Sequence, residues 1–164
     1  MHIRTSPSNL HPGFQRSSSF FLIKEFQRLK DEEISTRALE WNLSRSLSKI
    51  NYRIHTDAIA EKLIPNQLEP GQASQIYANE ADVLNMAIFS MTAKQWREAN
   101  PTKEGNMRDH AAVEQLVVLS NLESINAELI RRGVNQAERL HALNITAIAQ
   151  MRSLLASATI KTLK

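Results

Sequence analysis

The chain has 164 residues, of which 42% are hydrophobic and 23% are charged, and its formal net charge is +3. This length suits one domain, or one domain with an extension, and the composition is ordinary for a globular protein. Because there is no cysteine, disulfides, thiolate catalysis and cysteine-based metal sites are excluded. Only 5% of the residues are aromatic and four are glycine, which favours helices over sheets.

The positive charge is concentrated towards the N-terminus. Residues 1–53 contain nine Lys or Arg against five Asp or Glu, whereas the remaining residues contain eleven against twelve. Such a bias is compatible with nucleic acid as a partner but does not establish it. No apolar run approaches the roughly 20 residues of a membrane span, and residues 1–19 lack the apolar centre of a signal peptide. We therefore expect no membrane partner and a cytoplasmic location.

The first predicted elements are a tail and a long helix. Residues 1–19 are polar and aperiodic, which predicts a disordered tail. From about residue 20 to residue 50, apolar side chains recur at steps of three and four, as on one stripe of a helix: Leu22, Phe26 and Leu29, then Leu39, Leu43, Leu47 and Ile50. A helix of this length is typical of a connector or a coiled-coil-like element. The alternation at 50, 52 and 54 predicts a short extended piece, after which Thr56 caps a short helix that ends before Pro65.

Residues 65–164 predict a helical bundle. A helix over residues 73–89 is followed by a short one that ends at Ala99, opened by a capping box of Thr92 and Gln95. Another helix is predicted over residues 106–132, with Gly133 as its C-cap and the pair Asn135 and Glu138 opening the last helix. This connection is so short that the last two helices should form an antiparallel hairpin. The apolar face predicted for the last helix is Leu140, Leu143, Ala147, Met151 and Leu154.

The predicted fold class is therefore all-α: a long N-terminal helix leads into a small helical bundle that ends in an antiparallel helical hairpin. The expected organisation is a disordered tail over residues 1–19, a connector helix with a short helix over residues 20–64, and a C-terminal helical bundle over residues 65–164.

Catalytic chemistry is not indicated. The sequence has no P-loop, no glycine-rich dinucleotide motif and no nucleophile elbow. The five histidines lack metal-ligand spacing, so they are interpreted as surface or cap residues. Glu80 and Asp82 are interpreted as polar positions on an amphipathic helix. The acidic run at residues 31–33 reads as a solvated face paired with Arg28 and Arg37. We expect no enzyme, no catalytic, cofactor-binding or metal site, and no small-molecule substrate.

Residues 81–100 predict a helix, a tight turn and a second helix, with Ser90 where such turns usually hold glycine. This is the gross shape of a helix-turn-helix, and the second helix presents residue types that suit phosphate and base contacts: Thr92, Lys94, Gln95 and Arg97. Such corners are also common in plain helical bundles, where Trp96 would be a core anchor, and this structural interpretation is favoured. Basic residues of the long helix, Lys24 and Arg28 among them, could form a stripe, but interleaved acids favour a mixed-charge solvated face.

Four segments resemble a known family: FFLIKEFQRLKDEE, LEWNLSRSLSKINYRIHTDAIAEKLIP, IYANEADVLNMAIFSMTAKQWREANP and EGNMRDHAAVEQLVVLSNLESINAELI. Together they are similar to bacterial KilA-N domain proteins, over about residues 20–151. The resemblance implies an amino-terminal DNA-binding domain, of a kind shared among phages, large DNA viruses and bacterial mobile elements, followed by a helical region.

In that family, the stretch matching residues 21–30 closes the DNA-binding domain. Members usually approach it through a Trp–x–Ser–Pro–acidic–Phe-like segment, where this sequence has HPGFQRSSS. The resemblance therefore implies a truncated copy in which most of the DNA-binding domain is absent, with residues 1–19 translated from a disrupted or misassigned gene start. No DNA-contact residue can be carried over from the family.

Two functions remain open. The first is a non-catalytic, DNA-associated regulatory protein of KilA-N type, with DNA binding weak or lost in this chain. Its candidate DNA-binding residues are Thr92, Lys94, Gln95, Arg97, Lys24 and Arg28. The alternative is a helical protein–protein interaction or oligomerisation module with no DNA binding of its own, which forms a homo-oligomer through the long N-terminal helix.

Overall fold

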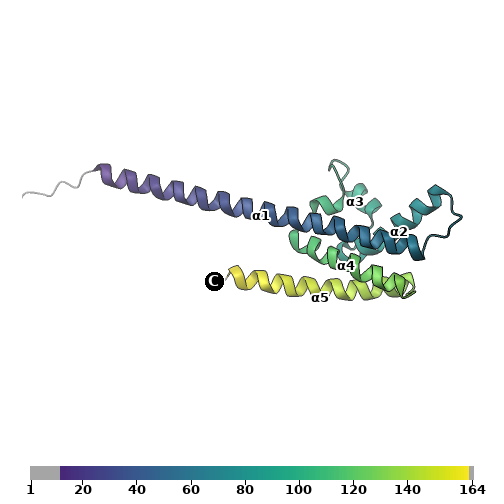
Figure 1. The fold of residues 1–164 in the computed structure, drawn as a ribbon. Helices are drawn as coiled ribbons and strands as arrows, with labels where there is room; N and C mark the ends of the chain where they lie inside the picture. Colours follow the sequence, from purple (N-terminus) through teal and green to yellow (C-terminus); the bar gives the residue numbers. More distant parts are fainter. Residues whose placement is uncertain (1–11, 163–164) are drawn as a thin grey trace, which may run out of the picture. The chain divides into compact units, whose positions relative to one another are not determined.

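A computed structural model describes residues 12–162. In chain order its elements are α1 (Pro12–Lys62), α2 (Pro70–Phe89), α3 (Ala93–Ala99), the 3-10 turn η1 (Met107–His110), α4 (Val113–Arg131) and α5 (Gln136–Thr162) (Figure 1). These residues contain no strand, so the predicted all-α class is confirmed. The chain divides into two compact units, residues 1–39 and 40–164, which are described separately below.

The first unit, where the structure describes it, is the opening part of α1. The helix begins at Pro12, a residue type that the first turn of a helix tolerates, so residues 12–19 are helical and not part of a tail. The rest of the predicted tail, residues 1–11, lies outside the described residues. Arg28 pairs with Glu25 and Glu32, and Arg37 Nη2 lies 2.6 Å from Glu33 Oε1. The predicted local pairing is thus confirmed for Glu32 and Glu33 of the acidic run.

The second unit contains residues 40–62 of α1, and here two predictions were wrong. There is no extended piece at residues 50–54 and no separate short helix, because α1 continues without interruption to Lys62. No glycine or proline interrupts this stretch before Pro65, and Ile50 and Ile54 are also one helical turn apart. Thr56 is therefore not a cap: its Oγ1 donates to the carbonyl oxygen of Arg53 within the helix, at 2.9 Å.

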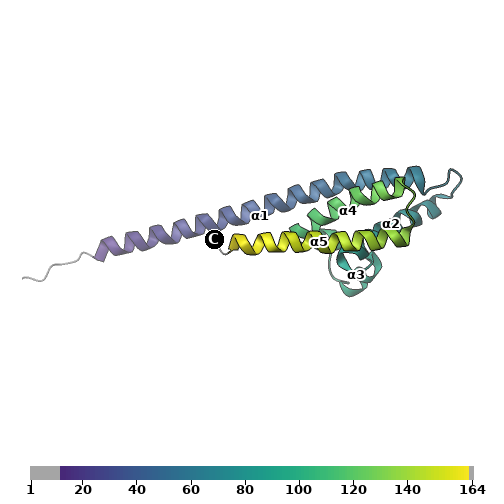
Figure 2. The same ribbon diagram turned by 90° about the horizontal axis from the view of Figure 1, so that it is seen from below.

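The main core lies between α2, α4 and α5. Helix α5 runs along both α2 and α4, and α4 and α5 form the predicted antiparallel hairpin (Figures 1 and 2). The predicted face of α5 is confirmed, since all five of its residues belong to this core or pack against it. The buried members of the core are Val83, Leu84, Ala87, Val118, Leu119, Leu122, Leu143 and Ala147.

Local chemistry sets the ends of the bundle helices. Ser90 closes α2 with a positive φ of 58°, the left-handed conformation for which glycine is usual. Gly133 has φ 76° after α4, and the backbone N–H of Glu138 donates to Asn135 Oδ1 at 3.0 Å as α5 begins. The single helix predicted over residues 106–132 is in fact interrupted, because Asn106 and Asp109 cap the short turn η1 and α4 starts only at Val113.

Within the second unit, α1 packs on the bundle through its more polar side. Ser44, Ser48 and His55 are buried there, and Asn51 donates to Ser120 of α4. A second core of Ala58, Ile59, Ala127 and Ile130 closes the contact near the end of α1. The apolar stripe predicted for α1 faces outwards instead. No helix in the described part of the chain is long and apolar enough to cross a membrane.

Candidate functional site

The corner of α2 and α3 has the helix–turn–helix shape that the sequence predicts, and two of its candidate DNA-binding residues form the cap. The backbone N–H of Gln95 donates to Thr92 Oγ1 at 3.2 Å, and the backbone N–H of Thr92 donates to Gln95 Oε1 at 2.8 Å. This is the predicted capping box. Asp82 adds a third bond by accepting from the backbone N–H of Ala93 at 2.8 Å. The side-chain oxygens of Thr92 and Gln95 thus cap the start of α3, and Asp82 ties that start to α2.

The other two candidates on α3 are exposed cations. Lys94 lies 3.9 Å from Glu98, one turn further along the helix, and its side chain is 83% exposed. Arg97 has no ion-pair partner among residues 12–162. Between them, Trp96 is buried and stacks on the ring of His110, with ring centroids 5.4 Å apart. The expected role of Trp96 as a core anchor is therefore confirmed.

Lys24 and Arg28, the remaining candidates, lie in the first unit. The ammonium of Lys24 lies over the ring of Phe20, 4.8 Å from its centroid. Arg28 is shared by two carboxylates, and the Arg28 side-chain hydrogen bond lowers the pKa of Glu25. The charge of Arg28 is thus locally compensated, as expected for a mixed-charge face.

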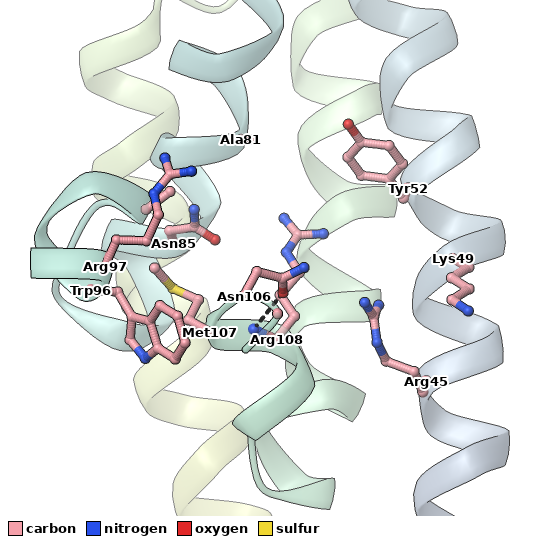
Figure 3. A pocket seen from close by; sticks show the side chains of 12 residues that line it. Arg45, Lys49, Tyr52, Ala81, Asn85, Trp96, Arg97, Asn106, Met107 and Arg108 are labelled. Atoms are coloured by element: carbon pink, nitrogen blue, oxygen red, sulfur yellow. Dashed lines mark hydrogen bonds between the residues drawn. The ribbon is translucent and has the colours of Figure 1, made fainter. Parts of the chain in front are cut away.

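The second unit has a pocket of about 380 Å³ that is lined by several cationic side chains, hereafter the cationic pocket. Arg45, Lys49 and Tyr52 reach it from α1, Arg97 and Trp96 belong to α3 on the other side, and Arg108 of η1 stands between them (Figure 3). The other lining residues are Ala81, Asn85, Ala93, Gly105, Asn106 and Met107. Four cationic side chains and no carboxylate line this pocket, which favours an anionic occupant.

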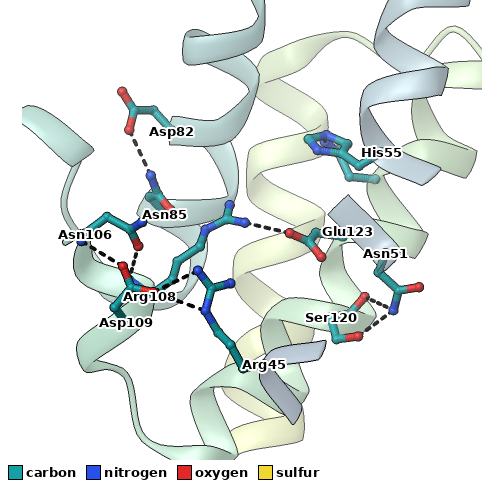
Figure 4. A network of polar contacts seen from close by, with 11 residues as sticks. Arg45, Asn51, His55, Asp82, Asn85, Asn106, Arg108, Asp109, Ser120 and Glu123 are labelled. Atoms are coloured by element: carbon teal, nitrogen blue, oxygen red, sulfur yellow. Dashed lines mark hydrogen bonds and ion pairs between the residues drawn. The ribbon is translucent and has the colours of Figure 1, made fainter. Parts of the chain in front are cut away.

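Arg45 and Arg108 each have an acidic partner that occupies only some of their N–H donors. Arg45 donates from Nε and Nη2 to one oxygen of Asp109, at 3.2 and 2.9 Å, and Arg108 Nη1 donates to Glu123 Oε1 at 2.7 Å (Figure 4). A guanidinium has five N–H donors, so several remain beyond these bonds on each arginine. The backbone N–H of Asn106 holds the pKa of Asp109 below its ordinary value, with help from Arg45.

Three further groups of the pocket are left without a partner within the described part of the chain: the cations of Lys49 and Arg97 and the side-chain oxygen of Asn85. Lys49 and Arg97 form no ion pair there. Asn85 is buried and donates from Nδ2 to Asp82 at 3.0 Å, while its Oδ1 accepts no hydrogen bond. The cationic pocket therefore offers many donors, one unused acceptor and apolar surface from Ala81 and Met107.

Behind the pocket, a network of polar side chains is buried between α1, α2, α4 and α5. Arg139 Nη1 and Nη2 bind the two carboxylate oxygens of Glu80 at 2.6 and 2.9 Å. Arg139 Nη1 also donates to Asn126 Oδ1 at 2.9 Å, so the amide of Asn126 faces His55 Nε2, 2.7 Å away. His55 must therefore accept at Nε2 and is neutral. Burial agrees, since it lowers the pKa of His55 to about 4.

The pKa values of two carboxylates in this network are shifted in opposite directions, although burial acts to raise both. For Glu80, burial alone would raise the pKa, but the bonds from Arg139 and Gln136 outweigh it and the pKa lies below its ordinary value. For Glu123, burial dominates over the attraction of Arg108 and raises the pKa to about 7. Only Oε1 of Glu123 has a partner, and Oε2 is buried without one in the described residues.

These buried polar residues correct the sequence interpretation. Glu80 is not a surface position and His55 is not a surface or cap histidine; both are buried. Asp82 is half-buried and caps α3. A signal for such residues did exist in α4, where polar residues share a stripe of steps three and four with apolar ones: Leu116, Leu119, Glu123, Asn126 and Ile130, all buried.

A second feature of the unit is the outward stripe of α1, hereafter the α1 face, formed by Leu43, Leu47, Ile50 and Ile54. Each of these side chains is between 40% and 60% exposed. They are spaced by four, three and four residues, which places them on one side of the helix. This face is opposite in character to the serine-rich side that packs on the bundle.

Residues 12–162 contain no group of three or more His, Asp or Glu side chains that could hold a metal ion. The cationic pocket suits an anion because of its positive charge, and the α1 face presents an apolar surface to a partner. No protein-family model matches this chain, and no curated protein matches it either.

Proposed function

We propose that this chain is a non-catalytic protein–protein interaction module that belongs to a DNA-associated regulatory protein of the KilA-N type. The observation that supports it is the orientation of α1 in the second unit. Ser48 and His55 are buried on the inner side, while Leu47 and Ile50 on the outer side are more than half exposed. A helix normally buries its apolar side, so the reversed arrangement supports a partner for the α1 face.

The partner we propose is a second copy of the chain. Apolar side chains at steps of three and four on a long helix are the pattern of helices that pair along their length. A two-fold pair would bring the same face of both copies together, as most homodimers do. Leu47 lies near the middle of the α1 face and would then lie near the symmetry axis.

Sedimentation velocity over a concentration range of about a hundredfold tests this, because self-association depends on protomer concentration. The unaltered chain should shift to a faster-sedimenting species as concentration rises. Leu47→Glu should remain monomeric, because its charge would be buried in the interface. Asn42→Glu is the matched control, since residue 42 is exposed on the same helix and lies off the α1 face. A chain that stays monomeric throughout, or equal losses in both variants, would contradict the proposal.

Direct association with DNA is the second candidate, and the exposed cations Lys94 and Arg97 on α3 favour it. Phosphate contacts release counterions, so affinity for DNA falls steeply with salt. Replacing Lys94 or Arg97 by Gln should weaken binding to all sequences and reduce the slope of log affinity against log salt by about one each. Thr92→Asn should leave affinity unchanged, because residue 92 serves as a cap. A salt-independent affinity would count against DNA phosphate contacts.

A further inference from the structure

Self-association through the α1 face does not explain the arrangement of positive charges in the cationic pocket. Its walls come from four different elements, α1, α2, α3 and η1, and they are held in place by the Arg45–Asp109 and Arg108–Glu123 pairs. Both arginine side chains are largely buried, at 17% and 12% exposed. The donors are therefore pre-arranged and need little further ordering to receive a ligand.

The balance of donors and acceptors defines the ligand. Arg45, Arg97, Arg108 and Lys49 supply cationic N–H groups, and Asp109 and Glu123 occupy only some of them. A group with several negatively charged oxygens would satisfy the remainder, and guanidinium groups match the geometry of phosphate. Lys49 on the α1 wall and Arg97 on the α3 wall, the two cations that have no acidic partner among the described residues, stand on either side of Arg108 and would flank such a group (Figure 3).

The rest of the pocket favours a flat, partly apolar group attached to the phosphate. Tyr52 is 41% exposed at the edge of the pocket, and the Arg108 guanidinium covers one face of its ring, 5.5 Å from the centroid, which leaves the other face for a flat group. The buried Oδ1 of Asn85 is an unused acceptor, to which an amino group of the ligand would donate a hydrogen bond. A volume of about 380 Å³ is at the lower end of the range of small-molecule sites.

We propose that the cationic pocket binds a nucleoside monophosphate, with its phosphate between Arg45, Arg108, Lys49 and Arg97 and its base near Tyr52 and Asn85. The same phosphate chemistry also occurs in the backbone of DNA, so the experiment compares the two sources. This proposal does not depend on self-association, and the Leu47→Glu variant should keep its affinity for the nucleotide.

Isothermal titration calorimetry of the full chain, at constant salt, tests the ligand class with four probes: adenosine 5′-monophosphate, inorganic phosphate, adenosine and a DNA duplex without terminal phosphates. The nucleotide should bind most tightly, inorganic phosphate more weakly and adenosine least. Adenosine binding as tightly as the nucleotide would overturn recognition of phosphate. Tighter binding of the duplex, lost with the same pocket variants, would assign the pocket to the DNA backbone instead.

Variants then locate the site. Lys49→Gln and Arg97→Gln should each weaken nucleotide binding about tenfold, the effect of losing one charge-assisted hydrogen bond. Neither cation has an acidic partner within residues 12–162, so both variants should fold, as circular dichroism can verify. The matched controls Arg53→Gln and Lys103→Gln remove exposed cations outside the pocket and should bind as the unaltered chain does. Equal losses in the controls, or no heat with the nucleotide at millimolar concentration, would refute the proposal.

Discussion

Arg139 of α5 donates hydrogen bonds to both carboxylate oxygens of Glu80 of α2 in the interior of the bundle, at 2.6 and 2.9 Å. Both side chains are buried, and Gln136 adds a third donor to Glu80 at 3.0 Å. This pair ties α2 to the start of α5, where the carbonyl oxygen of Val134 also accepts from Arg139.

Removing one member of the pair should be costly. Arg139→Met leaves a buried carboxylate without its cation, which should lower the free energy of unfolding by about 3–5 kcal/mol. Adding Glu80→Leu to Arg139→Met should restore part of the loss, because no charge is then left unpaired. Urea unfolding measures both effects. Arg152→Met, at an exposed position of α5, is the control and should change little; a double variant as unstable as the single one would contradict this account.

Features of the fold that depend on residues close together in the chain were predicted from the sequence, whereas contacts between distant residues were not. The capping box of Thr92 and Gln95, the turn at Gly133 and the start of α5 at Asn135 were predicted because each depends on neighbours within a few residues. The apolar face of α5 was predicted from its period. The all-α class followed from the same local signals.

The buried polar network could not be predicted in this way, because its partners are far apart in the chain. His55 meets Asn126, and Glu80 meets Arg139, only after four helices have packed. The side of α1 that packs on the bundle was not predicted either, because the leucine stripe indicated that the apolar side would be buried. The cationic pocket likewise combines residues 45–108 from four elements, and of its cations only Arg97 was among the candidate site residues.

Two buried groups, His55 and Glu123, should make the stability of the protein depend on pH in opposite directions. His55 has a pKa of about 4 in the fold, below its ordinary 6.5, so its contribution to stability is present above pH 6.5 and is lost as pH falls towards 4. Glu123 has a pKa of about 7, above its ordinary 4.5, so its contribution is present below pH 4.5 and is lost as pH rises through 7. Each amounts to about 3 kcal/mol at most, and they largely cancel between pH 4.5 and 6.5.

Single replacements should expose each contribution. Relative to the unaltered chain, Glu123→Gln should gain stability as pH rises from 4.5 to 7, because only the His55 effect remains. His55→Gln should lose stability over the same range, because only the Glu123 effect remains. Urea unfolding at several pH values measures the differences. Parallel pH profiles for all three proteins would show that neither group titrates as its burial requires.

Thr92 separates a structural role from a role in DNA contact. Thr92→Ala removes the acceptor for the N–H of Gln95 and should destabilise the protein by about 1 kcal/mol. Thr92→Asn should restore that loss, since Asn also caps helices well. Thermal unfolding monitored by circular dichroism would show the difference. Stability unchanged by Thr92→Ala would mean that the cap does not limit the folding of α3.

Phe26 is 61% exposed in the first unit, on the same side of the helix as the exposed residues Leu22 and Leu29. Large exposed apolar patches promote association, so Phe26→Glu should raise the concentration at which light scattering increases. Gln27→Glu adds the same charge at the next exposed position and should have a smaller effect. If the two variants are equally soluble, net charge rather than the loss of apolar surface explains the change.

The polar packing side of α1 has a further consequence for how the molecule opens. Releasing residues 44–55 from α4 would expose mainly Ser44, Ser48 and His55, whereas opening α4 itself would expose Leu116, Leu119 and Leu122. The urea dependence of an opening reaction follows the surface it uncovers. Amide hydrogen exchange in this part of α1 should therefore respond weakly to urea, while exchange in α4 responds strongly. Residues 44–55 would then open as a sub-global unfolding unit held mainly by hydrogen bonds, while Ala58 and Ile59 stay packed on Ala127 and Ile130 and the three-helix core persists.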